Sequence, residues 1–465
     1  MARYPTSTSP KRDRPSWAFL VLLICIISAP ASASELNSRI EIPEFRKRLL
    51  LNGMEVLCFE GDPGEAPFIL MIENGAAFDP VDKWGATYLM ASMLLEQTEQ
   101  YPEGTLQDGL RQAGAEIHLR VDWDALYFFG TAPPDRLEEA LNFLSEVIVR
   151  PDFDEDSLER VRRRVMADLE SGRDGIETRT REALISQVFD GNPYAQSVKG
   201  SLQSLENVYL TDIRFQYRRL MLPNQAKLAI YSPPDPDLFF SRFSRRWGSW
   251  VRGTALPFTF RQAPERDDAI VYLLNSDADS SLFRWGQLGA ERSSPEYFAL
   301  KVLGQYLTLH FPDWAREVSS SNQIRASARV EARKMPGLLE VSIQAPAGHI
   351  GAYLERLCRM ARQLQSGEID PGRFQEARRL VLGEYRSNLK DPFLRMFTVL
   401  ETELYGLGIN HISTFGLRLA RVTPESLQET IRTRNVDSRF VLTVAAPADR
   451  ILPLLQEIGR VDVLN

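Results

Sequence analysis

A long-period internal repeat constrains the fold of this 465-residue chain more than any other feature of its sequence. The segment FDEDSLERVRRRVMADLES (153–171) aligns without a gap on IDPGRFQEARRLVLGEYRS (369–387), so that Phe153 meets Ile369. The spacing of 216 residues is far longer than the roughly 20 to 50 residues of solenoid and propeller repeats. The repeat therefore predicts a duplicated domain.

The elements before the repeated segment also recur in the same order. Each copy has a strand-like run that ends in Ala-Pro, ALYFFGTAP (125–133) and LLEVSIQAP (338–346), followed by a helix whose apolar residues share one face. Chance similarity between two amphipathic helices is the alternative, and the recurrence of strand, helix and helix argues against it. The apolar positions are Leu137, Leu141, Leu144 and Ile148 in the first copy and Leu354, Leu357, Ala361 and Leu364 in the second.

Strand signals surround these helices. RLLLNGMEVLCFEG predicts a hairpin that turns at Asn52-Gly53, because this dipeptide favours the tight turns of hairpins. AKLAIYSPP (226–234) and RFVLTVAAP (439–447) predict closing strands in matching places. We therefore expect an α+β fold with two homologous lobes, each a mostly antiparallel sheet packed with helices.

The expected domain boundaries follow from this repeat. We predict an N-terminal lobe over residues 40–235 and a C-terminal lobe over residues 269–465. Residues 236–268 between them are rich in Pro, Arg and Trp and are expected to hold the linker.

The first 33 residues have the pattern of a secretory signal peptide. Four basic residues precede the apolar run AFLVLLICII (18–27), and Ala31-Ser32-Ala33 supplies small residues for cleavage. We expect cleavage after Ala33 and an exported protein, periplasmic or secreted; an uncleaved anchor is the alternative. No other segment reaches the about 18 apolar residues of a membrane span.

Charge and cysteine content narrow the partners further. The net charge of -7, with the signs mixed, gives no basic stripe and argues against a nucleic-acid partner. Only Cys58 and Cys358 lie beyond the predicted signal peptide. Two cysteines so far apart make no disulfide framework, and both are expected to be small buried hydrophobes.

Four blocks of the chain, taken in order, resemble the pitrilysin/insulinase (inverzincin) family of zinc metallopeptidases. They are KRLLLNGMEVLCFEG, NGAAFDPVDKWGATYLMASMLLEQTEQYP (74–102), VIVRPDFDEDSLERVRRRVMADLES and residues 192–230. The last block carries the landmarks Pro193-Tyr194, Gly200 and Pro223-Asn224. The resemblance implies two lobed halves and a substrate cavity between them.

The same resemblance shows that the zinc site is degenerate. In this family His-x-x-Glu-His places two imidazoles on one helical face for zinc, and its Glu is the general base. In the matching window YLMAS (88–92), Tyr88 and Ser92 stand in place of the histidines and Ala91 in place of the base. The distal ligand position falls at or near Asp168. We therefore predict no catalytic residue, no metal and no cofactor.

Shifting the alignment frame does not restore the ligands. The four histidines, His118, His310, His349 and His411, are scattered singly along the chain. Tyr88, Met90 and Met93 are expected to fill the vacated space with apolar bulk.

One substrate-handling residue is predicted in the second half. In this family that half often supplies an Arg and a Tyr that position the peptide. In WAREVSSSNQIRASARV (314–330), Arg316 matches the Arg, whereas the Tyr position falls on Gln323 or Ile324. Arg316 is thus a candidate substrate-binding residue, and an ordinary salt bridge at a helix end is the alternative.

Three functions fit this pattern. The favoured hypothesis is a non-catalytic subunit of an exported heteromeric zinc peptidase, which closes the cavity and helps to bind peptide for a zinc-bearing homologous chain. The second is a peptidase-derived scaffold or binding protein with no proteolytic role. The third is an active enzyme with a rebuilt site, and the loss of both histidines and the base argues against it. Whether a homodimer forms is left open.

Overall fold

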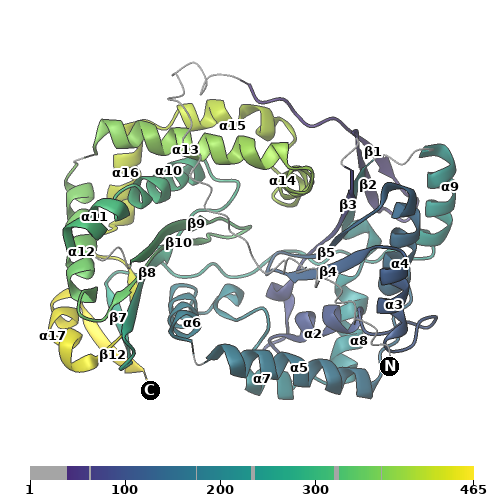
Figure 1. Ribbon diagram of the computed structural model, residues 1–465, viewed down its shortest axis with the longest axis horizontal. Coiled ribbons are helices and arrows are strands. Elements are labelled where there is room, and N and C mark those ends of the chain that lie inside the picture. Colours follow the sequence, from purple (N-terminus) through teal and green to yellow (C-terminus); the bar gives the residue numbers. More distant parts are fainter. Residues whose placement is uncertain are drawn as a thin grey trace, which may run out of the picture.

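The computed structural model describes residues 39–61, 64–173, 175–231, 236–318, 324–367 and 369–464. Within them the chain forms two lobes, each built on one six-stranded sheet with helices packed around it (Figure 1). The predicted signal peptide lies outside the described residues, so export stays a prediction. Among the residues described, no helix is both long and apolar enough to cross a membrane.

The N-terminal sheet has the strand order β1-β2-β6-β3-β5-β4. Only β2 and β6 pair in parallel; the other neighbours are antiparallel. The predicted hairpin at Asn52-Gly53 is present, and Gly53 has a φ of 90°, a conformation that favours glycine. The strands are β1 (Phe45–Leu49), β2 (Glu55–Phe59), β3 (Ala66–Glu73), β4 (Glu116–Val121), β5 (Ala125–Ala132) and β6 (Ala226–Tyr231).

The C-terminal sheet has the order β12-β7-β11-β8-β10-β9 and repeats the arrangement of the first. Its sixth strand differs, because β12 follows the repeated unit and pairs in parallel with β7, whereas β1 precedes its unit and pairs antiparallel with β2. Antiparallel pairs outnumber parallel pairs in both sheets, so the predicted α+β fold with two homologous lobes is confirmed. The strands are β7 (Ile270–Asn275), β8 (Ser280–Leu288), β9 (Arg325–Glu331), β10 (Leu338–Pro346), β11 (Val441–Ala446) and β12 (Arg460–Leu464).

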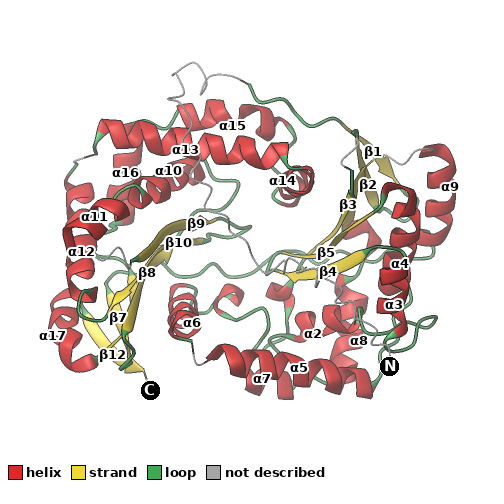
Figure 2. Ribbon diagram, viewed as in Figure 1, coloured by secondary structure: helices red, strands yellow, loops and turns green. Residues whose placement is uncertain are grey.

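The helices follow the same duplication (Figure 2). The aligned segments of the repeat form α5 and α13, and the amphipathic helices upstream of them form α4 and α12. In the first lobe the helices are α2 (Ala86–Met93), α3 (Thr105–Gln112), α4 (Leu137–Val149), α5 (Glu155–Arg173), α6 (Ile176–Val188), α7 (Leu202–Glu206), α8 (Leu210–Leu220) and α9 (Pro236–Trp247). In the second they are α10 (Glu296–Thr308), α11 (Phe311–Val318), α12 (Ile350–Ser366), α13 (Pro371–Lys390), α14 (Pro392–Leu404), α15 (Asn410–Ala420), α16 (Pro424–Arg434) and α17 (Ala448–Ile458). Short 3-10 turns lie at η1 (Ala76–Phe78), η2 (Pro134–Arg136), η3 (Pro193–Ala195) and η4 (Pro223–Gln225).

Part of the segment that was expected to be the linker is helical. Helix α9 packs on the N-terminal lobe through Phe239, Phe240, Phe243 and Trp247, all of which are buried in its core. The lobe boundaries themselves stay a prediction.

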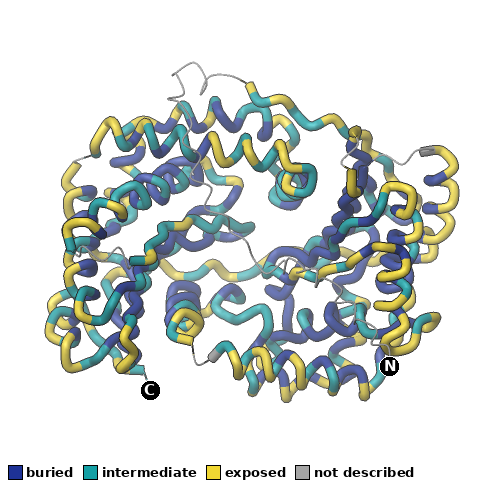
Figure 3. Tube along the Cα trace, in the orientation of Figure 1, coloured by how far each residue is buried: buried dark blue, intermediate teal, exposed yellow. Residues whose placement is uncertain are grey.

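One helix of each lobe packs against the sheet of the other lobe. Helix α14 of the second lobe places Met396, Val399 and Leu400 against Ile69 and Met71 of β3. Helix α6 of the first lobe packs in the same way on β8 and β11. Figure 3 shows buried residues along the strands of both sheets. Burying an aliphatic side chain contributes roughly 1.5–3 kcal/mol, so the exchanged helices bind the two lobes into one unit.

A buried polar contact also joins the lobes where two hairpin turns meet. Arg333, between β9 and β10, forms an ion pair with Asp122, between β4 and β5. Its guanidinium carbon lies 4.4 Å from the ring centre of Trp123. Asp124 accepts a hydrogen bond from the backbone N–H of Lys334 at 3.0 Å. We call these five residues the lobe junction.

Candidate functional site

Helix α2, which carries the three degenerate positions, is held by a carboxylate at its N-terminal end. Asp79 accepts hydrogen bonds from the backbone N–H of Gly85 at 2.7 Å and of Thr87 at 2.8 Å. Gln216 of α8 donates to the same carboxylate at 3.1 Å. Burial raises the pKa of Asp79 to about 6, against the opposing effect of these hydrogen bonds. The helix that would present a metal site is therefore built and capped.

The side chains at the degenerate positions provide packing. Tyr88 lies half-buried against the apolar core, whereas Ala91 and Ser92 are buried. Met90 and Met93 of the same helix belong to that core. None of these side chains offers the imidazole or carboxylate that zinc favours in proteins.

A lysine lies beside the remaining carboxylate. The Nζ atom of Lys199 is 3.8 Å from Oδ2 of Asp168 on α5 and 5.5 Å from the ring centre of Tyr88. The structure therefore brings together the helix position and the distal position predicted from the sequence, with an ammonium group next to both. Sequence reasoning missed Lys199, although it directly precedes the landmark Gly200.

Gly200 explains how Lys199 is positioned. Its φ is 77°, and a Cβ built on it would lie 2.1 Å from the carbonyl oxygen of Trp84, just before α2. Only glycine allows this close approach of the loop to the start of α2. Among the described residues, no group of three or more His, Cys, Asp or Glu side chains could hold a metal ion.

A large cavity flanks the Lys199–Asp168 pair. It has a volume of about 990 Å³ and receives Leu169 from α5, Val198 from the loop before Lys199, and most of the exposed side of α6. The second lobe contributes Leu274 and Arg284. Both apolar and charged side chains line this cavity, and its volume is large enough for a peptide segment.

A second cavity, of about 390 Å³, is lined by Asp122 and Arg333 of the lobe junction. It contains Glu384, the residue that the internal repeat aligns with Asp168. Burial raises the pKa of Glu401 in this cavity, although the nearby Arg292 and Arg120 oppose the rise. The cavity carries charges of both signs, contributed by both lobes.

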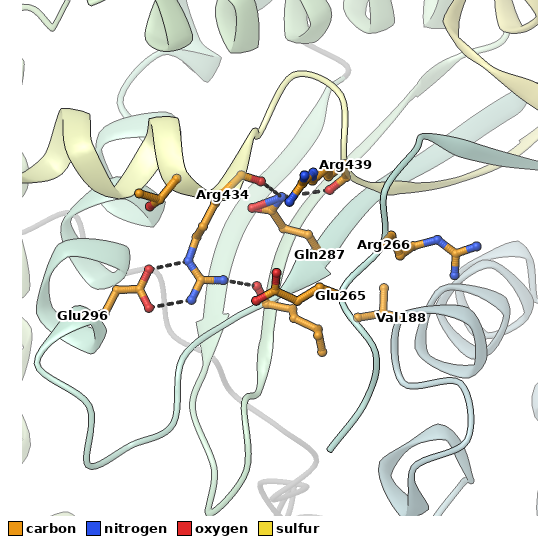
Figure 4. A pocket seen from close by; sticks show the side chains of 9 residues that line it. Val188, Glu265, Arg266, Gln287, Glu296, Arg434 and Arg439 are labelled. Atoms are coloured by element: carbon orange, nitrogen blue, oxygen red, sulfur yellow. Dashed lines mark hydrogen bonds and ion pairs between the residues drawn. The ribbon is translucent and has the colours of Figure 1, made fainter. Parts of the chain in front are cut away.

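A third pocket, of about 270 Å³, lies between the segment before β7 and α16 (Figure 4). Arg434 forms a bidentate ion pair with Glu296, in which Nη2 lies 2.6 Å from Oε2. Arg434 also donates to the carbonyl oxygens of Leu288 and Gly289. Gln287 donates to the backbone oxygen of Arg439 at 3.0 Å. The contacts of Arg434 fasten α16 to α10 and β8, so this pocket serves the fold.

Arg316, the predicted substrate residue, lies away from the degenerate site. It is on α11 of the second lobe, well separated from α2 in Figure 1. Its side chain is 70% exposed and forms an ion pair with Asp313 one turn earlier. Ile324 packs on the core of the second lobe, and Gln323 lies outside the described residues. A substrate-binding role for Arg316 stays a prediction.

A family profile described as "Insulinase (Peptidase family M16)" matches residues 65–201, which include α2, α5 and Lys199. This part of the N-terminal lobe is similar to the insulinase family. This match confirms the resemblance that the four sequence blocks indicated, and the degenerate positions lie within it.

The curated relatives of this chain include proteins without peptidase names. "Cytochrome b-c1 complex subunit 1, mitochondrial" is 22% identical in Caenorhabditis elegans, over 36% of this chain and 35% of that protein. The same subunit of Bos taurus is 19% identical, over 37% of this chain and 36% of that protein. "Non-peptidase homolog YmxG" of Helicobacter pylori is 19% identical, over 44% of this chain and 47% of that protein. The chain thus matches less than half the length of these relatives.

Solved structures share the whole two-lobed fold. A peptidase M16 inactive domain from Pseudomonas fluorescens superimposes with a TM-score of 0.77 at 18% identity, covering 87% of this chain and 98% of that one. A protease from Helicobacter pylori superimposes with a TM-score of 0.79 at 14% identity, covering 87% of this chain and 100% of that one. The periplasmic protease PqqL from Escherichia coli superimposes with a TM-score of 0.71 at 14% identity, covering 91% of this chain and 51% of that one. The chain therefore shares the two-lobed fold of these structures, one of which is described as an inactive M16 domain.

Proposed function

We propose that this chain is the non-catalytic subunit of an exported heteromeric zinc peptidase. It closes one side of the cavity and helps to bind peptide for a homologous chain that carries zinc. One observation carries the proposal: the capped helix, the paired lobes and the 990 Å³ cavity are all built, while the positions for metal and base hold Tyr88, Ala91 and Ser92.

Peptide binding is supported by the composition of the cavity wall. Extended peptides are held by apolar contacts between side chains and by polar groups that fix their direction. The wall offers Trp123 and Leu169 beside Arg179 and Glu182. Arg316 is a further candidate for peptide contact, and its ion pair with Asp313 would have to open for that role.

Co-purification from the native source tests the proposal. The expected result is a complex with a chain that carries an intact His-x-x-Glu-His motif, stoichiometric zinc in that partner, and peptide cleavage only when both chains are present. A stable monomer that binds zinc and cleaves peptide alone would contradict it.

A cavity variant separates substrate binding from assembly. Thr178 is exposed at the start of α6 and lines the cavity, so Thr178→Trp narrows it without disturbing the core. We expect the complex to form normally and cleavage of long peptides to fall. Ser366→Trp, at the exposed end of α12, is the control and should leave cleavage unchanged. Equal activity of both variants would exclude the cavity as a peptide site.

A scaffold role is the second candidate. The match to subunit 1 of the cytochrome b-c1 complex favours it, because that name describes a component of an assembly and not a peptidase. In the co-purification experiment, a stable complex with an unrelated protein and no peptidase chain would support the scaffold role.

A further inference from the structure

Four arginines gather around one pocket on the outer side of the N-terminal lobe. Arg150 follows α4, and Arg242, Arg245 and Arg246 project from α9. The pocket has a volume of about 260 Å³ and is also lined by Ser145, Glu146 and Ser249. We call it the arginine pocket.

The positive charge of this pocket is only partly neutralised within the chain. Arg242 is 3.4 Å from Glu138, and the contact between Arg150 and Glu146 is long, at 3.9 Å. Arg246 donates to a backbone carbonyl oxygen, which carries no full charge. The side chain of Arg245, which lines the pocket, has no hydrogen bond or ion pair with the part of the chain that the structure describes. The pocket thus keeps an excess of guanidinium charge.

Glu146 gives the pocket a second chemical feature. Its side chain is only 4% exposed, and its Oε1 atom has no hydrogen-bond partner within the described chain. A buried carboxylate oxygen without a donor is costly. A ligand that fits this pocket would therefore carry an anion for the arginines and a hydroxyl that donates to Glu146.

Two solvent-exposed aliphatic side chains lie near the arginine pocket. Leu51 is fully exposed at the tip of the β1–β2 hairpin, and Val251 is 79% exposed shortly after α9. The hairpin tip is fixed there because Asn52 donates to the backbone oxygens of Trp247 and Trp250 at 2.9 and 3.1 Å. The two apolar residues and the arginine pocket therefore lie at the same end of α9.

The internal duplication provides a comparison within the molecule. Helix α17 follows β11 as α9 follows β6, and it lies against α12 as α9 lies against α4. Yet the last turn of α17 carries no basic residue, whereas the last turn of α9 carries Arg245 and Arg246. The arginine pocket is therefore a property of one copy and not a requirement of the fold.

We propose that the arginine pocket, Leu51 and Val251 together dock the protein on the surface of an anionic phospholipid bilayer. Arginine matches phosphate oxygens with paired N–H donors, and basic groups beside protruding aliphatic side chains favour the interface of anionic membranes. Phosphatidylglycerol fits best, since its phosphodiester meets the guanidiniums and its headgroup hydroxyls can donate to Glu146. This docking is independent of the proposed peptidase role.

Vesicle sedimentation of the purified, N-terminally sequenced protein tests the proposal. The vesicles contain phosphatidylcholine alone or mixed with phosphatidylglycerol. We expect binding only to the mixed vesicles, and a loss of roughly thirtyfold in R245Q/R246Q, because each basic group near an anionic surface contributes about a fivefold factor. L51D/V251D should also weaken binding while leaving the melting temperature unchanged, since both side chains are exposed.

The matched control is R359Q/R362Q, which removes the same charge from exposed positions of α12 in the other lobe. It should bind mixed vesicles like the unaltered protein. Equal losses in R245Q/R246Q and R359Q/R362Q would overturn the proposal in favour of diffuse electrostatics. Equal binding to both kinds of vesicle would also overturn it. So would thermal stabilisation by inorganic phosphate that needs Arg245 and Arg246 but comes with no vesicle binding, because the pocket would then be a free-anion site.

Discussion

The lobe junction gives the sharpest test of how the two halves are held together. Arg333 pairs with Asp122, lies 3.1 Å from Glu331, and covers the ring of Trp123 at 4.4 Å. Burial alone would raise the pKa of Asp122, but the charges of Arg333 and Arg120 outweigh it and lower this pKa. The substitution Arg333→Met keeps much of the side-chain volume and removes the charge.

The expected cost follows from what remains. Removing one partner of a buried ion pair costs about 3–5 kcal/mol, because the other charge is left without compensation. Asp122 keeps Arg120, whose Nη2 lies 3.1 Å from its Oδ2, so the low end, about 3 kcal/mol, is expected for Arg333→Met. Asp122→Asn leaves Arg333 paired with Glu331 and should cost less, about 1–3 kcal/mol.

A double-mutant cycle measures whether these residues act as a pair. Because Arg333 and Asp122 are in direct contact, the double variant should be more stable than the sum of the single losses predicts, by about 2 kcal/mol. Urea unfolding followed by tryptophan fluorescence and by far-ultraviolet circular dichroism gives the free energies, and coincident transitions show whether the lobes unfold together.

The matched control is Arg316→Met, which also breaks an arginine–aspartate pair. That pair is exposed, with the arginine side chain 70% accessible, so a loss of about 1 kcal/mol or less is expected. Similar losses for Arg333→Met and Arg316→Met, or additive losses in the cycle, would refute the reasoning that the buried junction stabilises the paired lobes.

Four further predictions concern packing, backbone, acid and metal. Leu400→Ala on α14 should cost about 2–5 kcal/mol and increase hydrogen exchange in β3 of the first lobe. An increase confined to the second lobe would show that α14 does not stabilise β3. Gly200→Ala should lower the melting temperature because of its positive φ and its tight contact, while Gly172→Ala, with open space around it on α5, should not. Burial, together with two nearby arginines, lowers the pKa of His411 to about 3. The stability that neutral His411 contributes is therefore present above pH 6.5 and is lost as the pH falls toward 3. His411→Gln should reduce the slope of unfolding free energy against pH in this range by up to about 1.4 kcal/mol per pH unit, and an unchanged slope would contradict this. Zinc followed by a chelator should leave the melting temperature unchanged, and a reversible rise with zinc would reveal a site.

Much of the fold could be predicted because it depends on local patterns. Asn52-Gly53 specifies a tight turn, and the helical spacing around 137–148 and 354–364 identifies which side of α4 and α12 is apolar. The exchange of α6 and α14 could not be predicted in the same way. An apolar face shows that a helix must be covered, but not which of two similar sheets covers it.

The candidate site likewise has one part that the local sequence pattern predicts and one part that only the fold reveals. The motif register placed Tyr88, Ala91 and Ser92 on one helix, because three- and four-residue spacings share a face. Lys199 gave no such signal, since its place depends on the loop that Gly200 brings against the start of α2. A single lysine in a polar loop resembles any other surface residue until the fold places it beside Asp168.

The strength of each contact shows how the degenerate site stays in place. The pair between Lys199 and Asp168 is long and more than a third exposed at both side chains, so it is worth at most about 1 kcal/mol. A structural zinc ion can contribute about 10 kcal/mol or more to folding, so the ammonium offsets the carboxylate's charge without fastening the helices. That task falls to packing, because Met90 of α2 shares one core with Leu158 and Val165 of α5. Replacing Lys199 should therefore change the charge beside the cavity and leave the lobe folded, whereas Met90→Ala should cost about 2–5 kcal/mol.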